Sequence, residues 1–390
     1  MKKNKEIEKV IGKYKNEMCE LSKYIYDNPE LGFKEEKSSK AHVNYLKKHG
    51  FEVKENYLGF NTAFRADYIL DPSYPTFAFL SEYDALPEIG HGCGHNLLGA
   101  TDTTAGIVLK EFAKEYKLNV VVLGTPAEET SGVKVDMAKA DTFDDIDFAM
   151  CTHPNFKWLQ SGTSMAMDAI EFEFFGKTAH AAESPHEGLN ALDAAVSFYT
   201  NCSYLRQQIK TSTRIHGIIK NGGEACNIIP EYTSVQYYIR ALNMKDLNDL
   251  RQKIINCAEA AAVATGCKMK YHNFEKSYNN MITNNKMAQI FKDNTGNLGI
   301  DLQLKDIDSM GSLDMGNVSQ VVPSINPYFS ISKDKKVIAH TVEFREATLT
   351  DYAIKESMKM IEALVMTAID IAKDENLQEE IKKEFYESIR

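Results

Sequence analysis

The sequence predicts an α/β fold with a separate α+β block inserted into it. The apolar run at residues 119–124 is typical of a strand buried in a parallel sheet, and strands of this kind alternate with predicted helices. From residue 166 to 276 the order changes to strand, helix, two strands and helix, after which the α/β pattern resumes. At 390 residues the chain has room for two domains. We therefore expect an outer domain of residues 1–165 and 277–390 around an inserted domain of residues 166–276.

The elements of the outer domain are predicted from the spacing of apolar residues and from breaks at proline and glycine. In the first helix Ile7, Val10, Ile11 and Tyr14 recur at helical intervals, and Pro29 ends the pattern. The further expected elements are a helix over about 36–49, strands over 60–68 and 76–80, a helix after Gly99, a strand over 119–124, a strand ending near 150, and a closing helix over about 350–373.

The inserted block is predicted to contain three strands and two long helices. No internal repeat, low-complexity tract or Gly/Ser-rich linker is present, which favours an insertion over domains joined in series. The expected elements are strands over 168–175, 213–219 and 231–242, and helices over about 188–209 and 245–264.

The composition is that of an ordinary globular protein. Hydrophobic residues make up 43% and charged residues 26%, which excludes a disordered chain. The 45 basic and 55 acidic residues give a net charge of −10, which disfavours nucleic acid and an anionic membrane as partners. No run of about 18 apolar residues is present, residues 1–6 are charged, and the seven cysteines have no regular spacing. We expect a cytoplasmic protein without a membrane span or a disulfide framework.

The densest polar cluster lies at residues 91–96. Cys93 stands between His91 and His95, and the intervening glycines let the backbone turn tightly. Thiolate and imidazole are ligands suited to zinc and its neighbours, so this segment is a candidate metal site. A glycine-rich turn with an incidental thiol is the alternative. A structural zinc finger is not expected, because no second Cys or His pair stands at finger spacing.

Two adjacent carboxylates, Glu128 and Glu129, follow the apolar run at residues 119–124. Ligand sites collect at strand ends in parallel α/β sheets, where one carboxylate would bind metal and the other act as a general base. Alternatively, both side chains are solvated at the start of a helix, where the helix dipole favours acidic residues.

His153 and His340 are weaker candidates when each is taken alone, because a lone histidine is more often structural than a ligand. Their order along the chain changes this interpretation. All five candidate metal ligands lie in segments assigned to the outer domain, and they are Cys93, His95, Glu129, His153 and His340.

Several ordered motifs together resemble a known family. They are similar to the amidohydrolase branch of the aminoacylase/acetylornithine-deacetylase metallopeptidase superfamily, in particular to the B component of p-aminobenzoyl-glutamate hydrolase and to the β-alanyl-lysine-type dipeptidases. Glu82 and Asn96 depart from many members of this branch, which leaves the role of Glu82 open. The matching segments cover nearly the whole chain and are residues 29–33 (PELGF), 81–87 (SEYDALP), 91–96 (HGCGHN), 124–129 (GTPAEE), His153 with Pro154, and His340.

The resemblance implies a catalytic domain of the dinuclear-metal aminopeptidase type. Glu128 would be the general base that takes a proton from a metal-activated water and gives it to the leaving amine. Asp84 would be a carboxylate that orients a ligand, and His91 would support the site without binding metal. Two divalent metal ions per subunit, zinc or manganese with cobalt or nickel as alternatives, would be bound by Cys93, His95, Glu129, His153 and His340.

The resemblance also implies that the insert is a dimerisation or lid domain. His180 would reach an active site, often that of the partner subunit, and stabilise the tetrahedral oxyanion. Asn227 and Arg240 would hold the substrate α-carboxylate, since arginine forms a bidentate fork for carboxylates. The alternatives are a histidine that caps a turn and a plain surface ion pair of Arg240. The turn at residues 311–316 would line the substrate pocket with backbone donors.

We therefore expect a homodimeric metallohydrolase that cleaves an amide bond to an amino acid. Its small-molecule substrate would be an N-acyl amino acid, an aminobenzoyl-amino acid or an unusual dipeptide. One alternative is a cysteine hydrolase that uses Cys93 as nucleophile with His95 or His153 as base. The other is a catalytically silent subunit of the same fold, although such a subunit would have no chemical need for the ligand set or for Glu128.

Overall fold

The computed structural model describes residues 2–304 and 311–389 of the chain, which fold as two units. Unit 1 contains the described residues up to 163 and those from 281 on, except for the short segment 311–313. Unit 2 contains residues 164–280 together with 311–313, a segment that the sequence analysis placed in the outer domain. The assignment of a catalytic and a dimerisation domain, with limits at residues 165 and 276, stays a prediction.

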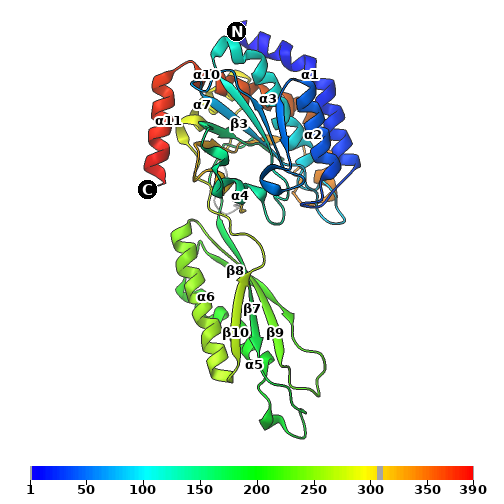
Figure 1. The fold of residues 1–390 in the computed structure, drawn as a ribbon, viewed down its shortest axis with the longest axis vertical. Helices are drawn as coiled ribbons and strands as arrows, with labels where there is room; N and C mark the ends of the chain where they lie inside the picture. The colour runs from blue at the N-terminus through cyan, green and yellow to red at the C-terminus, as the bar shows by residue number, and fades with distance from the viewer. Residues whose placement is uncertain (1, 305–310, 390) are drawn as a thin grey trace. The chain divides into compact units, whose positions relative to one another are not determined.

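Unit 1 is built on a six-stranded mixed sheet in the order β1-β2-β4-β3-β5-β11 (Figure 1). Neighbouring strands from β4 to β11 are parallel, whereas β2 is antiparallel to both of its neighbours. A separate two-stranded parallel sheet joins β6 and β12. The strands are β1 (Glu52–Glu55), β2 (Phe64–Tyr68), β3 (Thr76–Ser81), β4 (Asn119–Gly124), β5 (Phe148–Met150), β6 (His153–Asn155), β11 (Ser324–Ile325) and β12 (Tyr328–Ser330).

The helices of unit 1 pack on this sheet and on one another. Helix α3 contacts β3 and β4, and both α1 and α10 contact α3. The helices are α1 (Lys2–Asp27), α2 (Glu36–Lys48), α3 (His95–Tyr116), α4 (Val133–Lys139), α7 (Asn285–Asn297), α8 (Met315–Val318), α9 (Val342–Ala347), α10 (Asp351–Ala372) and α11 (Glu375–Ser388).

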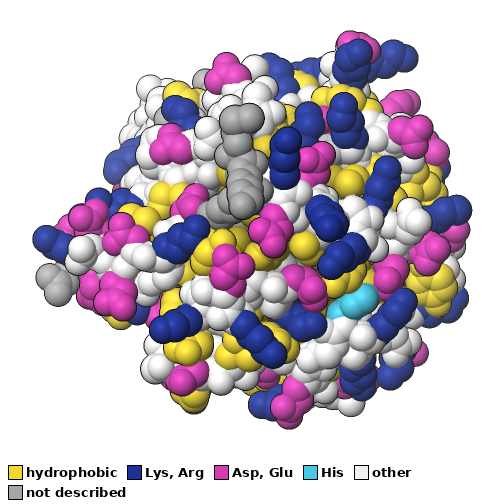
Figure 2. All heavy atoms as spheres, turned by 90° about the horizontal axis from the view of Figure 1, so that it is seen from above, with side chains coloured by type: hydrophobic (Ala, Val, Ile, Leu, Met, Phe, Trp, Pro, Cys, Tyr) yellow, Lys and Arg dark blue, Asp and Glu magenta, His cyan; other side chains and the backbone are white. Residues whose placement is uncertain are grey.

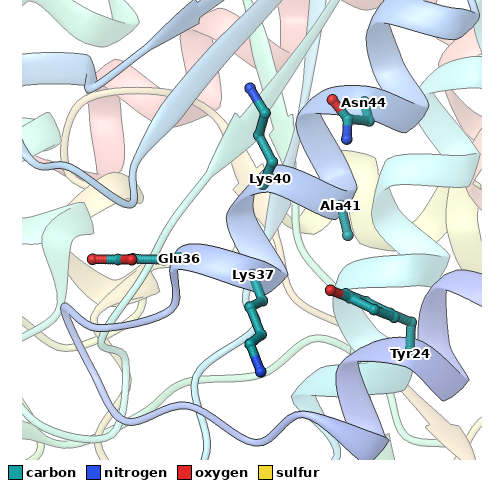
Figure 3. A pocket seen from close by; sticks show the side chains of 6 residues that line it. All are labelled: Tyr24, Glu36, Lys37, Lys40, Ala41 and Asn44. Atoms are coloured by element: carbon teal, nitrogen blue, oxygen red, sulfur yellow. The ribbon is translucent and has the colours of Figure 1, made fainter.

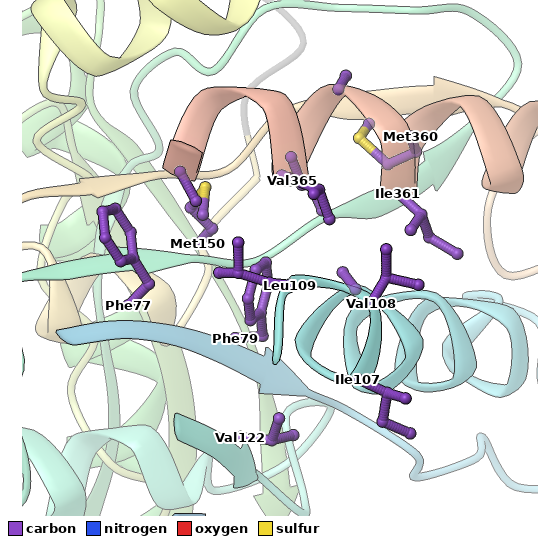
Figure 4. Close-up of a cluster of buried hydrophobic side chains, with 14 of the residues drawn as sticks. Phe77, Phe79, Ile107, Val108, Leu109, Val122, Met150, Met360, Ile361 and Val365 are labelled. Carbon is purple, nitrogen blue, oxygen red and sulfur yellow. The ribbon is translucent and has the colours of Figure 1, made fainter. Parts of the chain in front are cut away.

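The core of unit 1 holds the two central strands in place. Every residue of β3 and β4 is buried, as expected for parallel strands that are covered on both faces. Figure 4 shows side chains from β3, α3 and α10, among them Phe79, Leu109 and Val365, gathered in one cluster. Burying a side chain of this size contributes roughly 1.5–3 kcal/mol relative to exposure, so the ends of these strands are firmly positioned.

Unit 2 is a four-stranded antiparallel sheet in the order β10-β7-β9-β8, with two helices packed on β7 and β9 (Figure 1). Asn190 and Asn243 cap these helices by accepting hydrogen bonds from backbone N–H groups of their first turns. The elements are β7 (Ala166–Phe175), α5 (Ala191–Leu205), β8 (Arg214–Asn221), β9 (Tyr232–Ala241), α6 (Met244–Thr265) and β10 (Lys268–Asn273).

The α/β outer domain and the α+β insert predicted from the sequence agree with this architecture, but several predicted limits were wrong. The strand expected over 60–68 begins at Phe64, because a turn closed by the Ala63 N–H and the Phe60 C=O precedes it. The helix expected after Gly99 begins at His95. The chain does not close with α10, since α11 follows it.

Two features of the structure concern membranes and nucleic acid, the partners that the sequence disfavours. In the part of the chain that the structure describes, no helix is both long and apolar enough to cross a membrane. Figure 2 shows acidic and basic side chains interspersed over the face in view. That face therefore lacks the single-sign basic field that attracts nucleic acid.

Candidate metal centre

The candidate site lies at one edge of the unit 1 sheet, where three neighbouring parallel strands end. Glu82 and Asp84 follow β3 directly, Glu128 and Glu129 follow β4, and His153 comes shortly after β5. Because the carboxyl ends of parallel strands meet at the same edge, residues far apart in the sequence are brought together there.

Glycines shape the loop that carries Cys93 and His95. Gly94 has a φ of 81°, a left-handed conformation that permits the sharp turn into α3, which begins at His95. At Gly92 the backbone C=O accepts a hydrogen bond from the His340 N–H at 2.8 Å. This contact joins His340 to the cysteine loop although the two are distant in sequence.

The structure brings all five predicted ligands into two overlapping groups. In the first group, the ligand atoms of Cys93, His95 and His153 lie within 4.8 Å of one another, and Cys93 Sγ is 3.4 Å from His153 Nε2. In the second group, Cys93 is joined by Glu129 and His340, and His340 Nε2 is 3.5 Å from Glu129 Oε2. Cys93 belongs to both of these groups, so the two potential binding positions are adjacent, and a third group joins His95 to Glu82 and Glu128.

His95 and His153 both direct Nε2 toward the other candidate ligand atoms. His95 donates from Nδ1 to Asp84 Oδ1 at 2.9 Å, and His153 donates from Nδ1 to the Pro154 C=O at 2.7 Å. A carboxylate or carbonyl can only accept, so each Nδ1 is the donor in its contact, and each Nε2 is the ring nitrogen that faces the other candidate ligands. Asp84 also accepts from the Glu129 N–H at 3.0 Å, and thus holds two of the candidate ligands at once.

The donor atoms fit a divalent cation. Among the described residues, the buried atoms His95 Nε2, Glu129 Oε1 and Glu82 Oε2 have no hydrogen-bond partner, although His95 Nε2 lies 3.1 Å from Glu82 Oε2 at ion-pair distance. Leaving such atoms unsatisfied in a buried site is unfavourable, whereas a cation would accept their lone pairs. Thiolate, imidazole and carboxylate together suit zinc and its neighbours.

The chain is similar in sequence to known peptidases and hydrolases. The family model described as the peptidase dimerisation domain matches residues 165–266. The chain is 39% identical over 381 residues to the Xaa-Arg dipeptidase of Mus musculus, covering 94% of this chain and 88% of the mouse protein. It is 32% identical over 286 residues to the B component of p-aminobenzoyl-glutamate hydrolase from Escherichia coli (strain K12), covering 68% of this chain and 59% of that protein. The chain belongs to the M20 metallopeptidase family.

The fold of this M20 chain matches solved structures of the family. A dinuclear metal-binding peptidase of the M20 family from Bacillus subtilis superposes with a TM-score of 0.68 at 16% identity, covering 92% of this chain and 99% of that chain. The family and fold class expected from the motifs are thus confirmed, and the M20 chain is an enzyme of the metal-dependent amidohydrolase and metallopeptidase class.

The charged groups in the centre of the M20 enzyme shift the pKa values of their neighbours. Burial, followed by the charges of Glu82 and Glu129, raises the pKa of Glu128 well above its usual value. Burial would also raise the pKa of Glu82, but the positive charges of Lys134 and His95 outweigh it and the net direction is downward. A bound cation would offset the negative charges that raise the pKa of Glu128.

The thiol of Cys93 does not resemble an activated nucleophile. Burial, followed by the charge of Glu129, raises its pKa well above the usual value. Reactive cysteines have lowered pKa values, so the shift is opposite to the one that a cysteine hydrolase needs. A bound cation, in contrast, would favour the thiolate as a ligand.

A buried lysine at this site was not predicted from the sequence. Lys134, on α4, has no exposed side-chain surface, and its Nζ lies 2.8 Å from Glu82 Oε1 and 2.6 Å from Asp314 Oδ1. The role of Glu82, open in the sequence, includes this ion pair. Asp314 was noted only as part of a turn with backbone donors, but its carboxylate is buried and paired. No spacing rule distinguishes Lys134 from a solvated lysine in a short helix.

Three further predicted residues lie in unit 2. The exposed His180 accepts at Nδ1 from the Glu183 N–H at 3.1 Å, and the Ala181 N–H donates to the Asn227 C=O at 3.0 Å, so the two turns are joined. Arg240 donates to Ser312 Oγ at 3.1 Å, and among the described residues its buried Nε has no hydrogen-bond partner. Their participation in the active site stays a prediction.

Proposed function

We propose that this M20 enzyme is a dinuclear-metal hydrolase that releases an amino acid from a dipeptide or an N-acyl or aminobenzoyl amino acid. The convergence of five candidate metal ligands with Glu128 near the ends of β3, β4 and β5 supports this proposal. Dipeptides with carboxy-terminal arginine are the first substrates to test, because the mouse relative is named for them and aligns with most of the chain.

In this proposal each residue of the centre has a distinct task. Asp84 keeps His95 Nδ1 protonated and Nε2 available as a ligand. The Glu128 carboxylate takes a proton from the attacking water and delivers it to the leaving nitrogen. When bound, two divalent cations lower the pKa of that water and polarise the amide carbonyl. The ions, zinc or manganese first and cobalt or nickel as alternatives, would be held by Cys93, His95, Glu129, His153 and His340.

The residues of unit 2 would recognise the substrate. Arg240 would grip the α-carboxylate, supported by its partly unsatisfied guanidinium, and Asn227 would hold the same end of the substrate. His180 would donate to the oxyanion that develops on the amide carbonyl. The exposure of His180 is compatible with a contact made to substrate.

Metal analysis combined with an amino-acid release assay tests the proposed function. The purified protein should contain about two divalent ions per chain, and chelation should abolish release that returns when metal is added back. The panel should hold dipeptides ending in arginine or lysine, N-acetyl amino acids and p-aminobenzoyl-glutamate. Activity that survives chelation but is lost with iodoacetamide would establish the cysteine hydrolase instead, and a metal-loaded protein without activity would be the silent subunit.

The same panel tests recognition of the α-carboxylate. Each substrate is compared with its methyl ester, and the ester should have a kcat/KM ~10–100-fold lower if Arg240 forms a charge-assisted hydrogen bond to the free acid. Arg240→Lys should reproduce part of this loss on the acids only. Equal rates on acids and esters would remove Arg240 from the proposed site.

We further propose that the enzyme is a homodimer formed through residues 166–276. β8 is an edge strand of the unit 2 sheet, with Ile218 60% exposed, and an unpaired apolar edge is a common site of pairing across a two-fold axis. The match of residues 165–266 to the peptidase dimerisation domain also supports this assembly.

Mixing two inactive variants tests whether a dimer shares its active sites. If His180 serves the partner subunit, a mixed dimer of His180→Ala and Glu128→Gln chains has one site with both lesions and one intact site, so activity partly returns. If each His180 serves its own chain, every site keeps one lesion and activity does not return. A wild-type protein that is monomeric by light scattering would refute the proposed homodimer. If the wild type is a dimer and β8 forms its interface, the Ile218→Lys variant should be a monomer.

A further inference from the structure

The segment between α1 and α2 contacts both loops that carry the catalytic carboxylates. The C=O of Glu30 accepts a hydrogen bond from the Ala85 N–H at 2.8 Å, next to Asp84. The carboxylate of Glu35 accepts from the Ala127 N–H at 2.9 Å, next to Glu128. This segment contains the PELGF motif, to which the proposed function gives no task.

The contact at Ala127 stabilises an uncommon backbone conformation. Ala127 has a φ of 64°, in the left-handed region that is unfavourable for a residue with a Cβ atom. Such a conformation persists only where the surrounding structure determines it. Glu35 Oε1 provides the acceptor for the Ala127 N–H, and Ala127 itself is fully buried.

Gly32 packs closely against the loop that contains Ala127 and Thr130. A Cβ placed on Gly32 would lie 2.9 Å from the Cβ of Ala127 and 2.8 Å from Thr130 Oγ1. Real Cβ atoms essentially never approach so closely, so the loop must move if Gly32 gains a side chain. The loop therefore occupies a position that Gly32 permits and Glu35 fixes.

Glu35 is itself held on both oxygens. It is fully buried, and its Oε2 accepts a hydrogen bond from Thr62 Oγ1 at 2.9 Å. Burial, followed by the charge of Asp84, raises its pKa to about 7. Burial disfavours the charged form of the Glu35 carboxyl group, but both of its oxygens accept hydrogen bonds. The group is therefore suited to fix the positions of Ala127 and Thr62.

We propose that Glu35 is a positioning residue: by holding Ala127 in the left-handed conformation, it sets the direction in which the Glu128 carboxylate projects. This inference rests on the proposed function, in which Glu128 is the general base. Glu35 itself touches neither substrate nor metal ligand and acts only through the backbone of Ala127.

Two substitutions at Glu35 separate positioning from general stability. Glu35→Leu keeps the approximate size but removes both acceptors, so kcat should fall ~10–100-fold while KM and metal content stay unchanged. Glu35→Gln keeps an oxygen for the Ala127 N–H and offers an amide N–H to the Thr62 hydroxyl, so it should stay within about 3-fold of the wild-type kcat. Glu36→Leu is the matched control, because Glu36 is exposed and lines a surface pocket of α1 and α2 (Figure 3).

Gly32→Ala tests the proposal if Glu35→Leu does not fold. The added methyl group pushes on Ala127 while Glu35 remains intact, so kcat should again fall with KM and metal content unchanged. Hydrogen exchange at the Ala127 amide adds a readout that needs no substrate. Exchange should be slow in the wild type and in Glu35→Gln but faster in Glu35→Leu and in Gly32→Ala.

These outcomes distinguish the inference from the proposed function. A wild-type enzyme without metal-dependent activity contradicts the proposed function, while exchange at Ala127 still reports on the contact with Glu35. An active wild type with unchanged kcat and unchanged exchange in Glu35→Leu or Gly32→Ala overturns the inference alone. A loss of metal from these variants in proportion to kcat also overturns it, because the loop would then serve Glu129 rather than Glu128.

Discussion

Glu128→Gln should keep the full metal content of the enzyme and lower kcat by ~10²–10⁴-fold, the usual effect of removing a general base. An amide has nearly the shape of the carboxylate but cannot take the proton of the attacking water. The neighbouring substitution Glu129→Gln should instead lower metal occupancy, because Glu129 presents its oxygens to both His95 and His340. Metal content by mass spectrometry and kcat at saturating substrate measure the two effects.

Glu128→Gln and Glu129→Gln are well matched, because the two residues are adjacent and each substitution removes one negative charge. If both variants lose metal equally, the division of labour between base and ligand is wrong. A Glu128→Gln enzyme with near-normal turnover would exclude Glu128 as the base even if the metal assignment holds.

Lys134→Met should lower the free energy of unfolding by about 3–5 kcal/mol, the range expected when one partner of a buried ion pair is removed. The lysine has no exposed side-chain surface, and the substitution leaves the carboxylates of Glu82 and Asp314 without their shared countercharge. Denaturant unfolding of the metal-free protein measures the loss. Lys139→Met, at the exposed end of the same helix, is the control and should change stability little.

The triple variant Lys134→Met, Glu82→Gln, Asp314→Asn tests the electrostatic origin of this effect. Neutralising the two carboxylates removes the uncompensated charges, so part of the lost stability should return. If the triple variant is no more stable than Lys134→Met, the loss arises from packing of the lysine stem rather than from its charge.

The sequence predicted best those features that depend on local pattern. β4 is a continuous apolar run, and its burial on both faces makes that run recognisable. The candidate ligands at residues 91–96 and 128–129 lie in short segments where unusual residue types stand together. His153 and His340 were weak candidates taken alone, because no local pattern distinguishes them from structural histidines, and only their joint order and the family resemblance strengthened them.

The missed features depend on contacts between distant segments. β1 and β10 are short edge strands with mostly exposed residues, so neither shows a run of buried apolar residues. Lys134 and Glu35 are ordinary charged residues in the sequence. Their roles arise because tertiary folding buries them against Glu82 and Ala127, which lie far away along the chain.

The order of the strands in unit 1 has a consequence for biosynthesis. β11 pairs with β5, yet the whole of residues 164–280 is made between them. A chain that grows from its N-terminus therefore exposes the edge of β5 until Ser324 and Ile325 of β11 have been made. His340 emerges later still, so a nascent chain can present Cys93, His95, Glu129 and His153 before the last of the five candidate ligands exists. If the proposed function holds, metal captured at that stage would be held by an incomplete set until the C-terminal segment is made.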